Sequence, residues 1–195
     1  RWILLLSVRT VYFFRAGSND GYRVYTWNEE NRMTSIETSV EAVSTGLPKV
    51  RSEYLYDGQG RRALRTDCSG WNGAAYVSTN QTRFVWDGWL LLAELNNPGT
   101  GNPTTNFFAW GLDLSQSLQG SGGIGGLLAV VKDGVGYVPC VDGNGNISDY
   151  VDASGVVVAH REFDPFGRTV AASGEKQAEF AFWFSSKQED AWWGT

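Results

Sequence analysis

The residues that could do chemistry are few, and their spacing argues against most kinds of catalysis. The chain has one histidine, His160, and two cysteines, Cys68 and Cys140. Ser/His, Cys/His and histidine-metal sites each need an imidazole with specific neighbours, whereas His160 lies in a valine-rich alternating run typical of a strand. The two cysteines are too few for a disulfide framework and lack zinc-ligand spacing, so we interpret them as unpaired thiols.

Carboxylates are numerous, but none is singled out as catalytic. The scattered glutamates include Glu53, Glu94, Glu162 and Glu189. Their spacing does not say whether any two lie within the reach that paired acid/base catalysis requires. Asp164-Pro165 is the kind of dipeptide at which a carboxylate can attack its own peptide bond, but its surroundings favour a turn. We therefore predict no catalytic residue and no enzyme.

Two loops are superficially similar to ligand sites. Residues 120–126 have the glycine count of a phosphate loop, but no Lys-Ser or Lys-Thr follows and no βαβ unit surrounds them. The stretch from Asp142 begins like a calcium loop, yet Ile147 and Ala153 occupy positions that require Gly and Glu. The sequence thus predicts neither a metal nor a cofactor.

The charge balance and the aromatic content restrict the possible partners. Sixteen Lys and Arg against 21 Asp and Glu give a net charge of -5, and no basic face that would neutralise phosphates is visible. Nucleic acid is therefore excluded as an expected partner. Trp and Tyr exposed on a β surface can stack on sugars, which keeps carbohydrate or a cell surface open as an alternative partner.

The elements that must position these residues are predicted to be strands. Hydrophobic residues make up 42% of the chain, enough for a core, and 9 Trp, 8 Tyr and 10 Phe accompany 24 Gly. This combination favours pleated strands separated by tight turns over helices, and no segment shows sustained helical periodicity. We predict an all-β fold of tandem antiparallel hairpins that form a curved or spiral sheet.

Internal repetition is the strongest signal. An aromatic or apolar residue is followed by Asp or Asn, two variable residues, and then Gly or Asn. Asp at the first position and Gly at the fourth are typical of a type I turn that continues into a three-residue hairpin loop with a bulge. The residues predicted to set the turns are Asn28, Asn31, Asp57, Gly60, Asp87, Asp142, Gly145, Asp152, Gly155, Asp164 and Gly167. The copy at Asp87 is weaker, because it lacks the second glycine.

Aromatic residues alternate with variable ones ahead of most turns. The residues concerned are Tyr25, Trp27, Tyr54, Tyr56, Phe84, Trp86 and Phe163. A period of two places paired rings on one face of a sheet. We predict that rings from successive hairpins form a ladder, with each pair adding roughly 0.5–1.5 kcal/mol beyond area burial.

The remaining segments are less regular. Residues 96–105 and 120–126 are predicted to be loops, and a strand from Phe107 is predicted to run into a turn near Asp113. The apolar run at residues 2–6 is far shorter than the roughly 20 residues that span a bilayer, and it is no convincing signal peptide. The first residue is Arg1 and the chain stops at Thr195, so we expect a piece of something longer.

The repeats resemble a known family. The run Tyr54-Leu55-Tyr56-Asp57-Gly58-Gln59-Gly60-Arg61 is similar to the YD repeat of RHS proteins. Longer stretches at residues 25–35, 84–95, 110–115 and 161–167 resemble the region that leads into the RHS-repeat-associated core. The resemblance covers residues 21–190. Residues 1–20 are left unassigned, and residues 191–195 end the chain where the family usually continues with a tyrosine-rich run.

The resemblance implies a function for the fold. RHS polymorphic toxins and the C subunits of insecticidal toxin complexes form a hollow cocoon from a spiralling strip of hairpins, and teneurins use a related shell for adhesion. The cocoon holds a C-terminal toxin that an aspartyl autoprotease segment releases. Both would lie beyond this chain, so no catalytic residue is carried over. The implied partners are the rest of a longer chain and an encapsulated toxin, and the implied location is secreted or at the cell surface.

Overall fold

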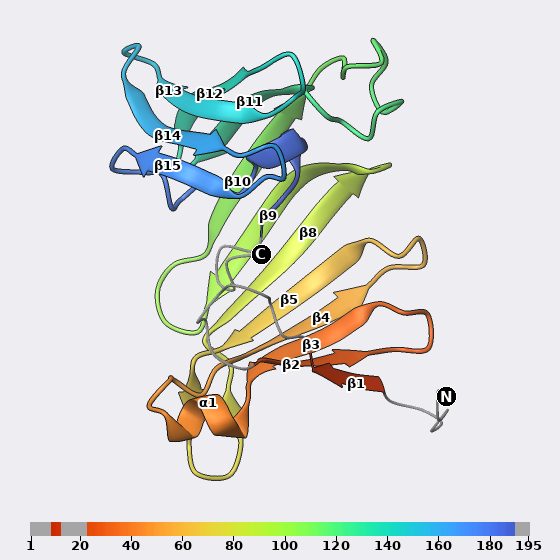
Figure 1. Cartoon of the computed structure of the whole chain (residues 1–195), viewed down its shortest axis with the longest axis vertical. Helices are drawn as coiled ribbons and strands as arrows, with labels where there is room; N and C mark the ends of the chain where they lie inside the picture. Colours follow the sequence, from red (N-terminus) through yellow and green to blue (C-terminus); the bar gives the residue numbers. More distant parts are fainter. Residues whose placement is uncertain (1–8, 13–22, 190–195) are drawn as a thin grey trace. The chain divides into compact units, whose positions relative to one another are not determined.

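The computed structural model describes residues 9–12 and 23–189, and its regular secondary structure is almost entirely antiparallel strands (Figure 1). Thirteen strands are hydrogen-bonded in chain order, from β1 at one edge to β15 at the other, and β6 and β7 form a separate two-stranded sheet. The predicted class, all-β with tandem antiparallel hairpins, is confirmed. The helices in the described part, α1 and η1, have five and three residues, far below the length of a bilayer span.

The elements have the following bounds: β1 Arg9–Tyr12, β2 Arg23–Trp27, β3 Met33–Thr38, α1 Val40–Ser44, β4 Arg51–Tyr56, β5 Arg62–Cys68, β6 Gly70–Trp71, β7 Tyr76–Val77 and β8 Asn80–Asp87. They continue with β9 Leu90–Pro98, β10 Thr104–Trp110, β11 Leu127–Lys132, β12 Val135–Val141, β13 Ile147–Asp152, β14 Val157–Phe163, β15 Thr169–Ser173 and the 3₁₀ turn η1 Phe184–Ser186.

The chain divides into two compact units. Unit 1 comprises Arg1–Phe84 and Leu95–Thr104, and unit 2 comprises Val85–Glu94 and Thr105–Thr195. The long hairpin of β8 and β9 therefore contributes its base to unit 1 and its tip to unit 2. Each unit is described by itself below.

Unit 1 contains β1 to β5 and two insertions. Four residues of the segment left unassigned in the sequence form β1, which pairs antiparallel with β2. The rest of that segment, residues 1–8 and 13–20, lies outside the described residues, as do the final residues 191–195. The domain boundaries at residues 21 and 190 stay predictions.

The helix α1 was not predicted. Ser39 is its N-cap, and its hydroxyl accepts a hydrogen bond from the Ala42 amide at 3.1 Å. Because the helix has five residues and buries only Ala42, it is too short to leave a periodic pattern in the sequence.

Unit 2 contains β10 to β15, and residues 174–189 fold back on it; we call these residues the C-terminal strap. Its aromatic residues Phe180, Phe182 and Trp183 are buried with Tyr137 and Tyr150 of the sheet. The strap is therefore part of the unit's core.

The loop predicted at residues 96–105 is shorter than expected. The strand β9 continues to Pro98, and β10 already begins at Thr104. The extension is held by partners that lie far away in the sequence: Thr82 donates to the Asn96 side chain at 2.8 Å, and the Gly99 amide donates to the Thr79 carbonyl at 2.8 Å. These cross-strand hydrogen bonds keep the end of β9 in a strand, although the composition of the segment is typical of a loop.

Candidate functional site

The repeat turns are the most regular feature of the molecule. Five turns share one geometry: residues 28–32, 57–61, 142–146, 152–156 and 164–168. In each, the first amide donates to the fifth carbonyl at 2.9–3.0 Å, and the fourth amide donates to the first carbonyl at 3.0 Å. A register shift lies beside every one of these turns. This is a type I turn closed by a bulge, which returns the chain antiparallel.

One side-chain oxygen organises each turn. The Oδ1 atom of the first residue accepts a hydrogen bond from the third amide at 2.8–3.1 Å and another from the fifth amide at 2.9–3.0 Å. Asp and Asn place an acceptor at this distance from their own backbone, and Ser and Thr do so more weakly. In each turn this oxygen already accepts two backbone hydrogen bonds, so it offers little to a ligand.

The fourth position of each turn has a left-handed backbone. The φ angles are 60° at Asn31, 81° at Gly60, Gly145 and Gly155, and 86° at Gly167. Glycine adopts this region without strain, and asparagine tolerates it better than most other residues, which explains why these two residue types occupy the fourth position in all five turns.

The fifth residue reinforces three of the turns. Arg61 donates through Nε to Asp57 Oδ2 at 2.7 Å, Asn146 donates to Asp142 Oδ2 at 2.8 Å, and Arg168 donates to Asp164 Oδ2 at 3.1 Å. Burial raises the pKa of Asp57 and Asp142, but hydrogen bonds from these residues and the turn amides outweigh it and lower both. The Arg168 amide is the main cause of the lowered pKa of Asp164.

Asp87 lies at a different kind of turn. It is the last residue of β8, and the reversal is made by Gly88 and Trp89 alone. The side chain of Gln119 holds this turn, since Gln119 Oε1 accepts from the Trp89 amide at 2.8 Å and its Nε2 donates to the Asp87 carbonyl at 3.2 Å. The weaker motif therefore marks a reversal without the carboxylate arrangement of the other five.

A turn was predicted at Asp113, and the structure shows that it is a sixth copy of the repeat turn, which the sequence did not indicate. The Asp113 amide donates to the Ser117 carbonyl at 2.7 Å, and the Gln116 amide donates to the Asp113 carbonyl at 2.8 Å. Gln116 occupies the left-handed position, with φ 60°. Because the position carries neither Gly nor Asn, the sequence gives no signal for it beyond the Asp itself.

Asp113 also anchors the glycine-rich loop at residues 120–126. Its Oδ2 atom accepts from the Ser121 amide at 2.6 Å and the Gly123 amide at 3.2 Å, while Oδ1 accepts from the Ser115 amide and hydroxyl. Burial raises the pKa of Asp113, but these hydrogen bonds outweigh it and lower the pKa to about 2. The loop amides that would cradle a phosphate thus hold a carboxylate of the protein itself.

The aromatic rings of unit 1 pack with guanidinium groups. Arg62 lies over the Tyr54 ring, with Cζ 4.4 Å from its centroid, and 5.9 Å from the Phe84 centroid. Arg32, from the first repeat turn, lies 5.4 Å over Tyr56. The predicted ladder of rings therefore includes cations between neighbouring hairpins. Of the other predicted ring positions in β2 and β8, Tyr25, Trp27 and Trp86 are half-buried.

Polar side chains also lie buried in unit 1. Ser52, Asp67 and Thr82 each expose 2% or less of their surface. Asp67 accepts from the Ser52 hydroxyl at 2.7 Å and from Arg65 Nε at 3.0 Å. Burying an ionised carboxylate without partners would be strongly unfavourable, so these bonds are required for the core to form.

The aromatic residues of unit 2 pack ring on ring. Phe180 of the strap stacks on Tyr150 with 3.8 Å between centroids, and Trp183 meets Tyr150 edge-on at 5.2 Å. Phe163, a predicted ladder residue, contacts Phe184 edge-on at 5.7 Å. The ring cluster is thus completed by a segment outside the strands.

Polar contacts fix the strap to the sheet. The Tyr150 hydroxyl donates to the Phe182 carbonyl at 2.7 Å, and Arg161 pairs with Glu189 at 2.7 Å while lying 4.3 Å over Trp183. The Ser186 hydroxyl donates to the Gly145 carbonyl at 2.7 Å and accepts from the Gly125 amide at 3.0 Å. One hydroxyl thereby joins a repeat turn to the glycine-rich loop.

The residues first considered for catalysis each have their own polar partners. Glu53 pairs with Arg51, Glu94 with Gln188 and Asn106, and Glu162 with His160. Each of these glutamates therefore has a separate partner, as Glu189 does. Cys68 is buried and Cys140 is exposed, and both thiols are free.

His160 lies between two carboxylates on the β13 and β14 strands. Its Nδ1 atom is 2.7 Å from Asp149 Oδ1, and its Nε2 atom is 3.4 Å from Glu162 Oε1. The Asp149 hydrogen bond is the main cause that raises the pKa of His160. Among the described residues, no serine or cysteine lies within hydrogen-bonding distance of the ring. The polar partners of His160 are therefore the two carboxylates, as in an ion pair.

Comparison with known proteins shows what the chain is similar to in sequence. No family model matches the chain. Over 150 residues it is 25% identical to the tRNA3(Ser)-specific nuclease WapA of Bacillus spizizenii, an alignment that covers 77% of this chain and 5% of that protein.

Solved toxin structures share the architecture. The TcdB2-TccC3 crystal structure has a TM-score of 0.59 at 16% identity, and so does the form without the hypervariable C-terminal region. The Photorhabdus luminescens Tc holotoxin pore with a TccC3 mutation has a TM-score of 0.58 at 17% identity. Each match covers 87% of this chain and 8% of the larger one. The chain therefore spans a small part of its relatives, and its fold is RHS-like.

Proposed function

We propose that this chain is a segment of the wall of an RHS-type toxin shell, a wall built from YD-repeat hairpins that surrounds a C-terminal effector. The observation that carries the proposal is the series of five identical turns, each of which returns the next strand to the edge of the same sheet. A strip that grows by one hairpin per repeat extends without limit along one direction, as a wall requires.

The chemistry of the turn residues supports a structural role. The carboxylates at the repeat turns accept backbone hydrogen bonds. Charged residues in the strands form ion pairs within the protein, such as Arg51 with Glu37 on the neighbouring strand and Arg161 with Glu189 of the strap. We propose that no residue of this segment is catalytic. Its partners would be the remainder of a longer polypeptide and the enclosed effector, and its location would be secreted or at the cell surface.

The wall proposal is tested in the natural polypeptide that contains this chain. If the chain helps to enclose an effector, the downstream region will resist a protease that rapidly digests the same region expressed alone. Trp183→Ala, which removes a fully buried ring from the unit 2 core, will increase the digestion rate several-fold, because a weakened wall opens more often.

Trp89→Ala is the matched control, because Trp89 is 61% exposed in the same unit. It will leave the digestion rate unchanged. Equal digestion of the enclosed and the isolated downstream region would refute the wall proposal.

The sequence left one alternative, a module that binds carbohydrate or a cell surface through exposed aromatic rings. One feature of unit 1 favours it locally: Trp71, which is 42% exposed, lies on a small hairpin outside the main sheet. A wall segment can carry such a site without losing its structural role.

A further inference from the structure

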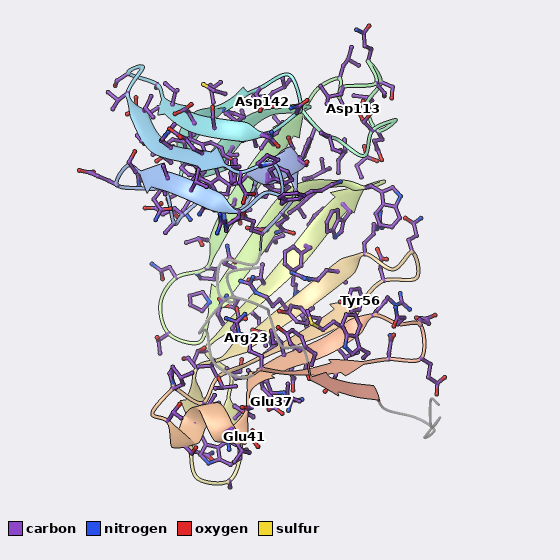
Figure 2. All side chains as sticks on the ribbon, viewed as in Figure 1. Arg23, Glu37, Glu41, Tyr56, Asp113 and Asp142 are labelled. Atoms are coloured by element: carbon purple, nitrogen blue, oxygen red, sulfur yellow. The ribbon has the colours of Figure 1, made fainter. Side chains whose placement is uncertain are left out.

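Two insertions interrupt the repeat pattern in unit 1. The connection from β3 to β4 contains α1, and the connection from β5 to β8 contains the β6–β7 hairpin. Antiparallel strands alternate in direction, so both insertions emerge at the end of the strands opposite to the repeat turns at Asn28 and Asp57. In Figure 1, α1 lies at that end of the unit, and in Figure 2 Glu37 and Glu41 lie there too, whereas Tyr56 lies toward the repeat turns.

The insertions enclose a pocket of about 240 Å³. Its lining residues are Val24, Glu37, Thr38, Ser39, Val40, Val43, Lys49, Trp71 and Tyr76. They come from β2, β3, α1 and the segment before β4, together with both strands of the small hairpin. The repeat turns do not contribute to the lining, and Ser39 is its one buried residue among those described. Insertions in repeat proteins commonly gather on one binding face.

Two rings form a corner in this pocket. Trp71 and Tyr76 meet edge to face, with centroids 5.1 Å apart and planes at 73°. Val40, at the rim, is 81% exposed, and Trp71 is 42% exposed. Both side chains expose apolar surface to solvent here, and a ligand bound in the pocket would cover that surface.

One cation and one anion accompany the rings. Lys49 Nζ lies 3.2 Å from the Trp71 centroid, and it donates no hydrogen bond to any residue in the described ranges. Glu37 hydrogen-bonds to Tyr76 and lies 3.5 Å from Arg51. Burial, and then the Glu37 hydrogen bond, raise the pKa of Tyr76 to about 12, so the phenol keeps its proton at neutral pH.

The hydroxyl groups of the lining are already occupied. Thr38 donates to the Pro48 carbonyl at 2.9 Å, and Ser39 caps α1. The groups that can still select a ligand are the Lys49 ammonium, the lone pairs of the Glu37 carboxylate that Arg51 and Tyr76 leave unused, and the aromatic corner.

The size of the pocket and the charges that line it restrict the kinds of ligand that it can bind. Pockets for drug-sized ligands measure roughly 300–1,000 Å³, so this smaller pocket has room for about one six-membered ring. The ammonium repels a cation and the carboxylate repels an anion, which favours a neutral ligand. A purely apolar group would cover both charges without giving them hydrogen bonds, which is unfavourable.

A sugar ring meets all of these requirements. Its C–H face packs on an aromatic surface, while its hydroxyls both accept from an ammonium and donate to a carboxylate. We propose that the Trp71–Tyr76 pocket binds one neutral hexose ring, such as the terminal residue of a glycan. When the sugar binds, the Lys49 ammonium moves off the Trp71 ring, which becomes the platform; Lys49 and Glu37 then orient the hydroxyls, and Val40 closes the rim. The site is independent of the proposed wall function, because it lies on the insertions.

The proposal is tested by saturation-transfer NMR with the 195-residue chain and the methyl glycosides of glucose, galactose, mannose and N-acetylglucosamine. We expect saturable binding of at least one of the four. Trp71→Ala will weaken it at least tenfold by removing the platform. Val40→Arg will weaken it to a similar extent by filling the pocket, and because Val40 is exposed this change leaves the core intact.

Trp89→Ala removes an exposed tryptophan of unit 2 and serves as the control; it will retain the binding of the unchanged chain. Circular dichroism verifies that every variant keeps the β spectrum. Absence of binding for all four glycosides overturns the proposal, and so does equal weakening by Trp89→Ala. Protease protection of a downstream region is a separate measurement, so a failed sugar site leaves the wall proposal to its own test.

Discussion

The two units use the same turns but different cores. In unit 1 the rings of Tyr54 and Phe84 pack against Arg62, and the carboxylate of Asp67 lies buried among hydroxyls and a guanidinium. In unit 2 the rings of Tyr150, Phe180 and Trp183 pack on one another, and the C-terminal strap supplies two of the three. The turns at Asp57 and Asp142 nevertheless have the same hydrogen bonds to within 0.1 Å.

This difference shows where the repetition of the sequence resides. The five-residue reversal is specified locally by one oxygen and one left-handed residue, so it recurs wherever those two residues recur. The packing of a strand face depends on segments distant in the sequence, so it varies from hairpin to hairpin. The repeat therefore sets the path of the backbone, and each unit completes its own core.

The largest expected effect is in the core of unit 2. Trp183 is fully buried, contacts Tyr150 and donates through its indole N–H to the Phe180 carbonyl at 2.8 Å. Trp183→Ala will lower the free energy of unfolding by about 3–5 kcal/mol, measured by urea denaturation. Trp89→Ala, at an exposed site, will change it by less than about 0.5 kcal/mol. Similar values for the two variants would contradict a strap that belongs to the core.

A pair of turn glycines separates backbone strain from packing. Gly145 and Gly155 have the same φ of 81°, but a Cβ at Gly145 would lie 2.4 Å from Ile124 Cγ2, whereas one at Gly155 meets nothing within 4 Å. Gly155→Ala will cost roughly 1–2 kcal/mol of unfolding free energy. Gly145→Ala will cost roughly 2–4 kcal/mol, because overpacking adds to the strain. Equal losses in denaturation experiments would show that the glycine-rich loop does not pack on the turn.

The sequence was informative where structure is local. Asp57 and Gly60 identify their turn because both determinants lie within four residues. A turn was also predicted near Asp113, but its likeness to the repeat turns was not, because Gln116 at the left-handed position is neither Gly nor Asn. The packing of the strap was not predicted from the sequence. Phe180 and Trp183 are buried because they pack on Tyr150, some 30 residues away, and no local pattern indicates that contact.

The packing of guanidinium groups on the rings of unit 1 also could not be predicted from the sequence. Alternation placed Tyr54 correctly on a strand face, but only the register between β4 and β5 brings Arg62 over its ring. Register follows from turn geometry and from burial of the whole face, so it requires the fold to be known first. The same holds for the pocket at Trp71, whose walls come from two separate insertions.

The polar core of unit 1 gives the next expected effect. Asp67→Ala removes the acceptor of both the Ser52 hydroxyl and Arg65 Nε, and it will lower the unfolding free energy by roughly 1.5–3 kcal/mol. Asp67→Asn, which keeps an acceptor for Ser52, will recover part of that loss in the same urea titration. A variant with alanine as stable as the unchanged chain would mean that the carboxylate is dispensable in this core.

Acid will act on unit 2 through Asp113. Its pKa of about 2 is below the unfolded value of about 3.9, so its stabilisation is fully present above pH 4 and is lost as the pH falls toward 2. Asp113→Asn will remove that part of the acid dependence. Carboxyl NMR titration measures the pKa directly, and a midpoint near 3.9 would contradict the four hydrogen bonds.

His160 will have the smallest effect on stability. Its contribution is lost as the pH rises, whereas that of Asp113 is lost as the pH falls. The hydrogen bond from its ring to Asp149 raises the folded pKa above the ordinary value of about 6.5. The imidazolium is therefore favoured in the folded state, and its stabilisation is fully present below pH 6.5 and is lost as the pH rises through the folded pKa. His160→Gln will flatten stability between neutral and mildly alkaline pH while leaving the acid limb set by Asp113 unchanged. Thermal melts across that range measure the change, and a ring that titrates below 6.5 by NMR would show that burial prevails over Asp149 and Glu162.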